Sequence, residues 1–181
     1  NDRIAQAGEV IVMDMAAYFD GYAADITRTV PVSGRFSAEQ RAVYEVVLNA
    51  QKAAERQVRV DGPSRAMNDS ANAVIAAGLT ALGLIESPTA TYDCGSAQQP
   101  RMCPQTFLYY MHGLGHGIGL LVHDPDQYSA TGRIQVGSAF TIEPGIYVRG
   151  NLLDILADTP RNRELKARIG PAVRRYANIG V

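Results

Sequence analysis

The chain has 181 residues, of which 46% are hydrophobic and 19% charged, a composition typical of one globular domain and not of a disordered chain. Its 17 Lys and Arg residues nearly balance its 18 Asp and Glu residues, so the sequence offers no basic surface for a nucleic-acid backbone. No apolar run approaches the roughly 18 residues that cross a bilayer, which argues against a membrane protein.

Residues 9–32 predict a β-hairpin, because β-prone residues flank the pair Asp20-Gly21. Both central residues of a two-residue hairpin turn need a positive φ, which this pair adopts readily. In that register residue 16 lies opposite residue 25, which makes Asp14 and Asp25 diagonal neighbours on one face. Two carboxylates this close repel each other unless a cation lies between them. From the hairpin alone, an orientation of one or both toward solvent stays open.

Two amphipathic helices are expected next. Ser37 and Gln40 form a capping-box pattern, and apolar residues from Val43 to Val58 recur at helical spacing, which predicts a helix of about 20 residues. After a turn at residues 61–63, Ser64 is expected to cap a second helix, whose apolar face runs from Met67 to Leu82.

The stretch 91–107 is rich in Gly, Gln and Pro and is expected to be a loop. Its two cysteines, Cys94 and Cys103, fit either free thiols or a loop disulfide of an exported protein, so the compartment stays open between cytoplasmic and exported.

The C-terminal half predicts strands and one helix. Residues 107–124 and 138–149 are glycine-punctuated apolar runs and are expected to be strands. Thr159 and Pro160 begin a basic helix that Gly170-Pro171 is expected to interrupt, with its basic residues, 161–175, on a solvated face. The apolar end, residues 178–181, predicts the start of a further strand. Because hairpin and helices occur in separate blocks, this order predicts an α+β fold.

All three histidines fall within one short segment: His112, His116 and His123. Its four alternating glycines disfavour a helix and favour an extended strand, on which His112 and His116 share a face. Glu143, followed by Pro144, lies in a predicted strand that is apolar on both sides, where an ionised carboxylate is costly unless it is paired or binds a metal. The plain alternatives are a core or surface role for each histidine and an exposed strand end for Glu143.

These residues together suggest a metal site. Two aspartates, a glutamate and at least one histidine, without sulfur, suit a hard divalent ion such as Mn²⁺ better than structural zinc. Carboxylates also bridge, so a pair of metal ions is natural. Such a pair activates a water molecule and polarises a carbonyl group, which is hydrolase chemistry.

The sequence resembles the pita-bread metallopeptidases, which include methionine aminopeptidase, Xaa-Pro aminopeptidase and prolidase. The resemblance rests on three ordered motifs, DMAAYFDGYAADITRTVPVSGRFSAEQRAVYEVV, HGLGHGIGLLVHD and TIEPGIYV, and extends over about residues 9–148. The motifs DITRT and EPGIY are similar to those of the proline-specific branch of this family.

The resemblance implies a pita-bread fold, here incomplete at both ends, with a curved and mostly antiparallel sheet and helices on its outer face. It implies that Asp14 binds one metal ion, that Asp25 bridges two, and that His116 and Glu143 are further ligands. The expected cofactors are two divalent ions, with Mn²⁺ preferred and Co²⁺ or Zn²⁺ as alternatives.

The resemblance also implies catalytic roles. Glu143 would be the general base toward the bridging water. His123 would hydrogen-bond the substrate and the tetrahedral intermediate, and His112 would line the substrate pocket.

The implied function is hydrolysis of the bond between an N-terminal residue and a following proline. The expected partners are peptides with proline in second position, without nucleic acid or membrane, and the full-length protein is expected to be a homo-oligomer. Alternatives are an Xaa-Pro dipeptidase and a metal-free, non-enzymatic binding module.

Residues 1–181 would form part of a metallopeptidase catalytic domain. The family has a second bridging Glu, which is expected beyond Val181, so the isolated chain is expected to be inactive.

Overall fold

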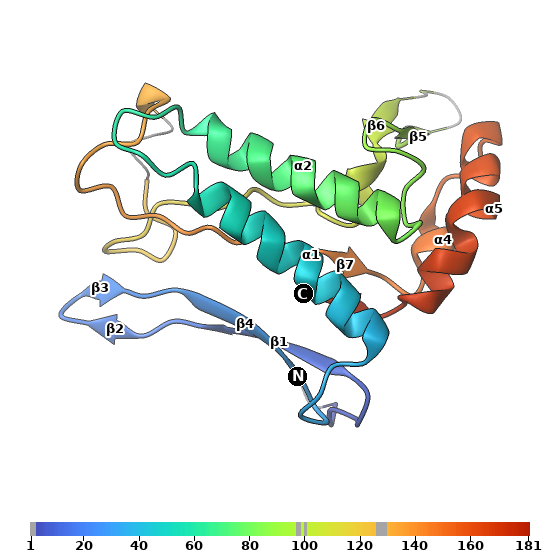
Figure 1. The fold of residues 1–181 in the computed structure, drawn as a ribbon, viewed down its shortest axis with the longest axis horizontal. Coiled ribbons are helices and arrows are strands. Elements are labelled where there is room, and N and C mark those ends of the chain that lie inside the picture. Colours follow the sequence, from blue (N-terminus) through green and yellow to red (C-terminus); the bar gives the residue numbers. More distant parts are fainter. Residues whose placement is uncertain (1–2, 97–98, 100, 126–129) are drawn as a thin grey trace.

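The computed structural model describes residues 3–96, 99, 101–125 and 130–181. A long β-ribbon, β1–β4, lies along one side of a pair of antiparallel helices, α1 and α2 (Figure 1). The elements β5, β6, α4 and α5 gather at one end of this helix pair. Among the described residues, no helix is both long and apolar enough to span a membrane.

The ribbon confirms the predicted hairpin and its register. Its four strands are β1 (Val10–Met15), β2 (Tyr18–Phe19), β3 (Tyr22–Ala23) and β4 (Ile26–Pro31). Asp20 and Gly21 form the turn with φ angles of 51° and 83°. Pairing continues without a slip from Phe19 and Tyr22 at the tip to Val10 and Pro31 at the base. A two-residue turn fixes the register of both strands, and so the relative positions of residues 14 and 25.

Helices α1 (Ala38–Glu55) and α2 (Arg65–Ala81) are also as expected, apart from two details. The capping box is complete, because the Ser37 hydroxyl accepts a hydrogen bond from the Gln40 N–H and the Gln40 side chain accepts one from the Ser37 N–H. The expectations for Val58 and Ser64 are wrong: Val58 lies beyond the end of α1 and is exposed, and the Ser64 side chain makes no capping bond.

The predicted loop at residues 91–107 contains a short hairpin instead. Strands β5 (Thr91–Asp93) and β6 (Met102–Pro104) pair antiparallel, and a disulfide joins Cys94, directly after β5, to Cys103 in the middle of β6. The short 3₁₀ helix η1 (Gln105–Leu108) follows and leads into the histidine segment. The sequence alone did not decide between free thiols and a disulfide for these two cysteines, and the structure has the disulfide.

The predicted strands at 107–124 and 138–149 are largely wrong. Within their described parts only isolated bridges form, apart from β7 (Tyr147–Val148). Residues 114–118 and 139–143 do run antiparallel, but their main-chain bonds are sparse. One reason is that the His116 N–H bonds to the Thr141 side chain and not to the opposite main chain.

The C-terminal region has one helix that was not expected and one that is longer than expected. The short helix α4 (Leu152–Ile155) was not foreseen, and α5 (Pro160–Arg175) continues through Gly170-Pro171 without interruption. A proline removes one helical hydrogen bond, and the small Gly170 before it limits steric crowding. Burial of Ile169 and Val173 on either side anchors both halves of α5. Strand β8 (Ile179–Gly180) pairs with β7, which confirms the predicted C-terminal strand.

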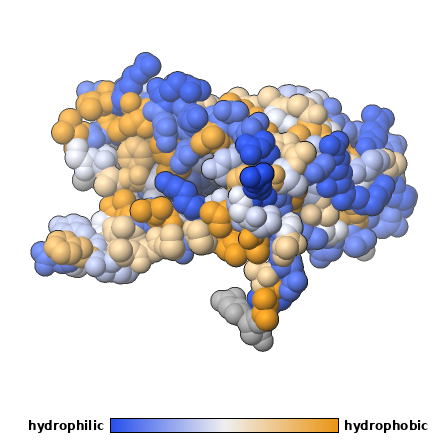
Figure 2. Space-filling view, turned by 60° about the horizontal axis from the view of Figure 1, so that its bottom comes forward, coloured by the Kyte–Doolittle hydropathy of each residue, from blue (hydrophilic) through white to orange (hydrophobic). Residues whose placement is uncertain are grey.

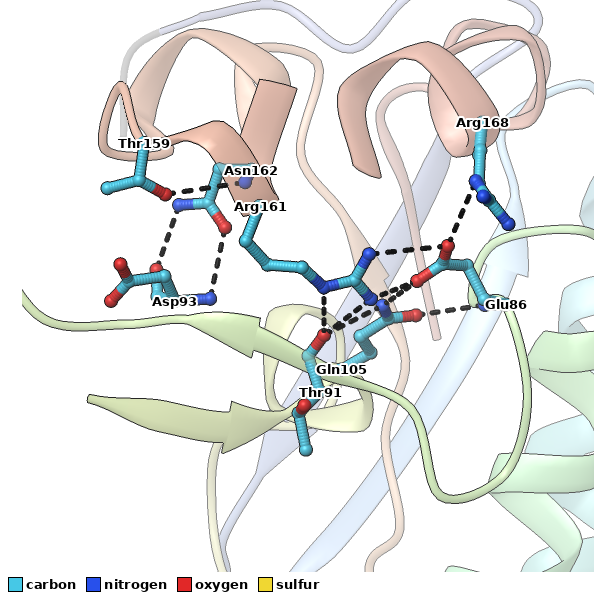
Figure 3. Close-up of polar contacts among 8 residues, drawn as sticks. All are labelled: Glu86, Thr91, Asp93, Gln105, Thr159, Arg161, Asn162 and Arg168. Carbon is cyan, nitrogen blue, oxygen red and sulfur yellow. Dashed lines mark hydrogen bonds and ion pairs between the residues drawn. The ribbon is translucent and has the colours of Figure 1, made fainter. Parts of the chain in front are cut away.

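The expectation that the basic residues of α5 face solvent is wrong for Arg161. This side chain bonds to the carboxylate of Glu86 and to the main-chain carbonyl of Thr91, and Arg168 contacts the same carboxylate (Figure 3). The Asn162 amide exchanges two hydrogen bonds with the main chain of Asp93. These contacts fasten the start of α5 to the disulfide hairpin.

The core lies between α1, α2 and α5 and also holds the segments that carry the histidines and Glu143. Tyr109 and Ile146 are fully buried in it, and the Tyr109 hydroxyl donates a 2.7 Å hydrogen bond to the Leu84 carbonyl. The α+β class is confirmed, with every described strand pair antiparallel, although the strands form four separate two-stranded pairs.

Candidate metal centre

Three side chains from distant parts of the chain meet at one point. Asp25 directly precedes β4, His116 lies in the glycine-rich segment, and Glu143 lies on the segment opposite it. The Nε2 atom of His116 is 3.3 Å from Asp25 Oδ2 and 3.0 Å from Glu143 Oε1. One atom from each residue lies within 4.8 Å of the others, so a single cation could contact all three.

Close backbone approach brings His116 and Glu143 together. The Glu143 N–H donates a 2.7 Å hydrogen bond to the Leu114 carbonyl, and the Thr141 N–H donates a 2.9 Å bond to the His116 carbonyl. A side chain at Gly115 would collide with the Thr141 carbonyl group, so this approach requires glycine.

The ribbon reaches the same place through its tip. The Ala23 N–H donates a 2.8 Å hydrogen bond to the Gly119 carbonyl, which holds the β2–β3 turn region against the glycine-rich segment. Asp25 follows two residues later and therefore faces the other two side chains.

The tautomer of His116 favours a cation at this point. Its Nδ1 atom lies 3.0 Å from the Gly117 carbonyl oxygen, which only accepts hydrogen bonds, so Nδ1 carries the hydrogen. In the neutral ring the Nε2 lone pair then faces two carboxylate oxygens. That arrangement is repulsive unless a proton or a metal ion lies between them.

The electrostatics at Asp25 also favour a cation. Burial, followed by the neighbouring carboxylates of Asp14 and Glu143, raises the pKa of Asp25 above its usual value. Among the described residues, no Lys or Arg forms an ion pair with Asp14, Asp25 or Glu143. A divalent ion would relieve this crowding, and carboxylate oxygens with one imidazole form a suitable donor set.

The structure brings together all the residues predicted for the site, at different distances. They line one open cavity of about 870 Å³ between the ribbon and α1, seen in Figure 2 as a hollow with both hydrophilic and hydrophobic residues at its border. Asp14 lies beside Asp25 but outside the compact group of three. The members of this predicted set are Asp14, Asp25, His112, His116, His123 and Glu143.

His123 and His112 flank the group of three. The ring of His123 lies 4.0 Å from the ring of His116, centroid to centroid, and its side chain is exposed to the cavity. His112 donates from Nδ1 to the Gly113 carbonyl at 2.8 Å, so its Nε2 atom accepts from the Tyr147 hydroxyl at 3.2 Å.

Sequence reasoning missed three residues around the site. Tyr147 bonds to His112, and burial followed by the charge of Glu143 raises its pKa. Thr141 bonds to the Glu143 carboxylate, and the Gln51 amide of α1 donates to the Ile142 carbonyl at 3.3 Å. Threonine and tyrosine are common in strands, and Gln51 is far away in the sequence, so no pattern identified them.

Comparison with known proteins places the chain among peptidases. Residues 1–174 match the model of metallopeptidase family M24. The chain is 37% identical over 150 residues to the Xaa-Pro aminopeptidase of Haemophilus influenzae, which covers 82% of this chain and 33% of that protein. It is 32% identical over 188 residues to the human Xaa-Pro dipeptidase, covering 93% of this chain and 36% of that protein.

A solved structure shows the same architecture. The Pseudomonas aeruginosa aminopeptidase PepP aligns with a TM-score of 0.75 and 32% identity, over 100% of this chain and 36% of that chain. The chain thus spans about a third of the length of the curated relatives named above.

Proposed function

Because this chain belongs to metallopeptidase family M24 and has the pita-bread fold of its structural relative, we propose that it is part of the catalytic domain of an Xaa-Pro aminopeptidase. The reaction is hydrolysis of the peptide bond between an N-terminal residue and a following proline. The observation that carries the proposal is the meeting of Asp25, His116 and Glu143 around one point in an open cavity.

Members of this metallopeptidase family use divalent metal ions, and the donor set of this chain fits them. We propose two ions, which Asp14, Asp25, His116 and Glu143 would hold. The oxygen-rich set favours Mn²⁺. When bound, the ions would lower the pKa of a water molecule and polarise the scissile carbonyl group.

The protein side chains would orient the substrate and move its protons. Glu143 would accept a proton from the attacking water as general base. His123 faces the cavity beside His116 and would donate a hydrogen bond to the carbonyl oxygen as negative charge develops on it. His112 is held by Tyr147 and Gly113 and would line the pocket for the substrate.

Activity of the full-length protein on two peptides tests this proposal. After removal of metal and addition of Mn²⁺, we expect cleavage of Ala-Pro-Ala, loss of cleavage with a chelator, and loss in the Asp25→Asn variant, which keeps the side-chain size but removes the charge. If the protein cleaves the dipeptide Ala-Pro but not Ala-Pro-Ala, the dipeptidase alternative is favoured. The human relative is an Xaa-Pro dipeptidase. A protein that binds Mn²⁺ but cleaves neither peptide would refute the proposal, and one that binds no metal would favour the non-enzymatic alternative.

A further inference from the structure

The hydroxyl group of Thr141 joins two of the proposed metal ligands. Its Oγ1 atom accepts a 2.9 Å hydrogen bond from the main-chain N–H of His116. The same hydroxyl donates a 2.7 Å hydrogen bond to Oε1 of Glu143. We propose that Thr141 is a positioning residue of the metal centre, which fixes the Glu143 carboxylate relative to His116. This inference rests on the proposed function.

The hydroxyl group is the part of Thr141 that links His116 to Glu143. It accepts from an N–H and donates to a carboxylate at the same time, whereas an aliphatic side chain of similar size does neither. The Glu143 side chain is about one-third exposed, at 37%, and so it would otherwise be free to change its rotamer. The Thr141 hydroxyl keeps Oε1 of Glu143 at 3.0 Å from Nε2 of His116.

Main-chain contacts hold Thr141 in place in addition to those of its hydroxyl. The Thr141 N–H bonds to the His116 carbonyl, and Gly115 packs directly against the Thr141 carbonyl group. The next carbonyl, that of Ile142, accepts a hydrogen bond from Gln51 on α1. Removal of the hydroxyl should therefore leave the fold intact while it releases the Glu143 carboxylate.

The expected effect is on metal affinity. Loss of a hydrogen bond that orients a metal ligand typically weakens metal binding or activity by about 10- to 100-fold. We expect Thr141→Val to weaken Mn²⁺ binding by this factor. Thr141→Ser keeps both hydrogen bonds and should bind Mn²⁺ within about threefold of the wild type.

Calorimetric titration of the metal-free, full-length protein with Mn²⁺ tests the inference. The matched control is Thr80→Val, because the Thr80 hydroxyl donates its hydrogen bond to the Ala76 carbonyl within α2. Urea unfolding without metal measures whether each variant folds. If Thr141→Val disturbs the fold, Thr141→Ala removes the hydroxyl with a smaller side chain.

The outcomes separate this inference from the function on which it rests. Weak binding in Thr141→Val or Thr141→Ala, with near-normal binding in Thr141→Ser and Thr80→Val, would support the positioning role. A wild type that binds Mn²⁺ and a Thr141→Val variant that binds it equally well would overturn the positioning role alone. A wild type that binds no Mn²⁺ would overturn the metal centre and this inference together.

Discussion

Replacement of Gly115 by alanine should separate the two segments that carry His116 and Glu143. A Cβ atom at residue 115 would lie 2.7 Å from the carbonyl carbon of Thr141 and closer still to its oxygen. The contact with the oxygen is the shortest, at 2.1 Å, and contacts below about 3.0 Å essentially never occur, so the segments must move apart by about 0.9 Å. Both neighbours in this contact are main chain, which rules out relief by a change of rotamer.

This displacement would break two hydrogen bonds. The Glu143–Leu114 and Thr141–His116 main-chain bonds, now 2.7 and 2.9 Å, would lengthen to about 3.6 and 3.8 Å, beyond the normal hydrogen-bond range. Each hydrogen bond contributes about 0.5–1.5 kcal/mol to stability, so the loss of both should lower the free energy of unfolding by about 1–3 kcal/mol. Because His116 and Glu143 separate as well, Mn²⁺ affinity should fall by about tenfold or more.

The matched control is Gly113→Ala, the same change two residues earlier in the same segment. A Cβ atom there would meet nothing within 4 Å, and the backbone of Gly113 does not need a positive φ. Urea unfolding and Mn²⁺ titration of both variants in the full-length protein would measure the difference. We expect Gly113→Ala to stay within about 0.5 kcal/mol of the wild type. Equal stability and equal Mn²⁺ affinity in the two variants would refute the close-packing argument.

Three further predictions concern other residues. His123→Ala should lower kcat without loss of bound metal, because the proposed hydrogen bond from His123 to the substrate carbonyl oxygen acts on the chemical step and not on metal binding; elemental analysis showing lost metal would instead make His123 a ligand. A hydrogen bond from Arg161 is the main cause that holds the pKa of Glu86 below its usual 4.5. Glu86 thus stabilises the fold above about pH 4.5 and less as the pH falls through its lower folded pKa, so Glu86→Gln should flatten the acid side of the stability curve; an unchanged curve would contradict this. Ser37→Ala should cost about 1 kcal/mol of unfolding free energy and Ser64→Ala little, since only Ser37 makes a capping bond; equal losses on urea unfolding would contradict the assignment.

Local sequence rules predicted the parts of the fold that local interactions determine. The Asp20-Gly21 turn has two residues, so its position alone sets the pairing of the whole ribbon and brings Asp14 next to Asp25. The Ser37–Gln40 capping box marked the start of α1 for the same reason, because all its bonds lie within one helical turn.

The predictions that failed depend on tertiary contacts. Burial of Ile169 and Val173 keeps α5 continuous through Pro171, against the local preference of proline. The glycines near His116 indicated close packing, but not that the Thr141 hydroxyl would replace part of a strand ladder. Hydrogen bonds between residues 25 positions apart leave no periodic signal in one sequence.

Whether these side chains hold metal can be measured directly by anomalous X-ray diffraction from crystals of the full-length protein grown with Mn²⁺. We predict an anomalous peak in direct contact with an Asp25 oxygen, Nε2 of His116 and a Glu143 oxygen, and a second peak shared between Asp14 and Asp25. A map with no peak at Asp25, His116 and Glu143, or with manganese bound only elsewhere, would contradict the proposed metal centre.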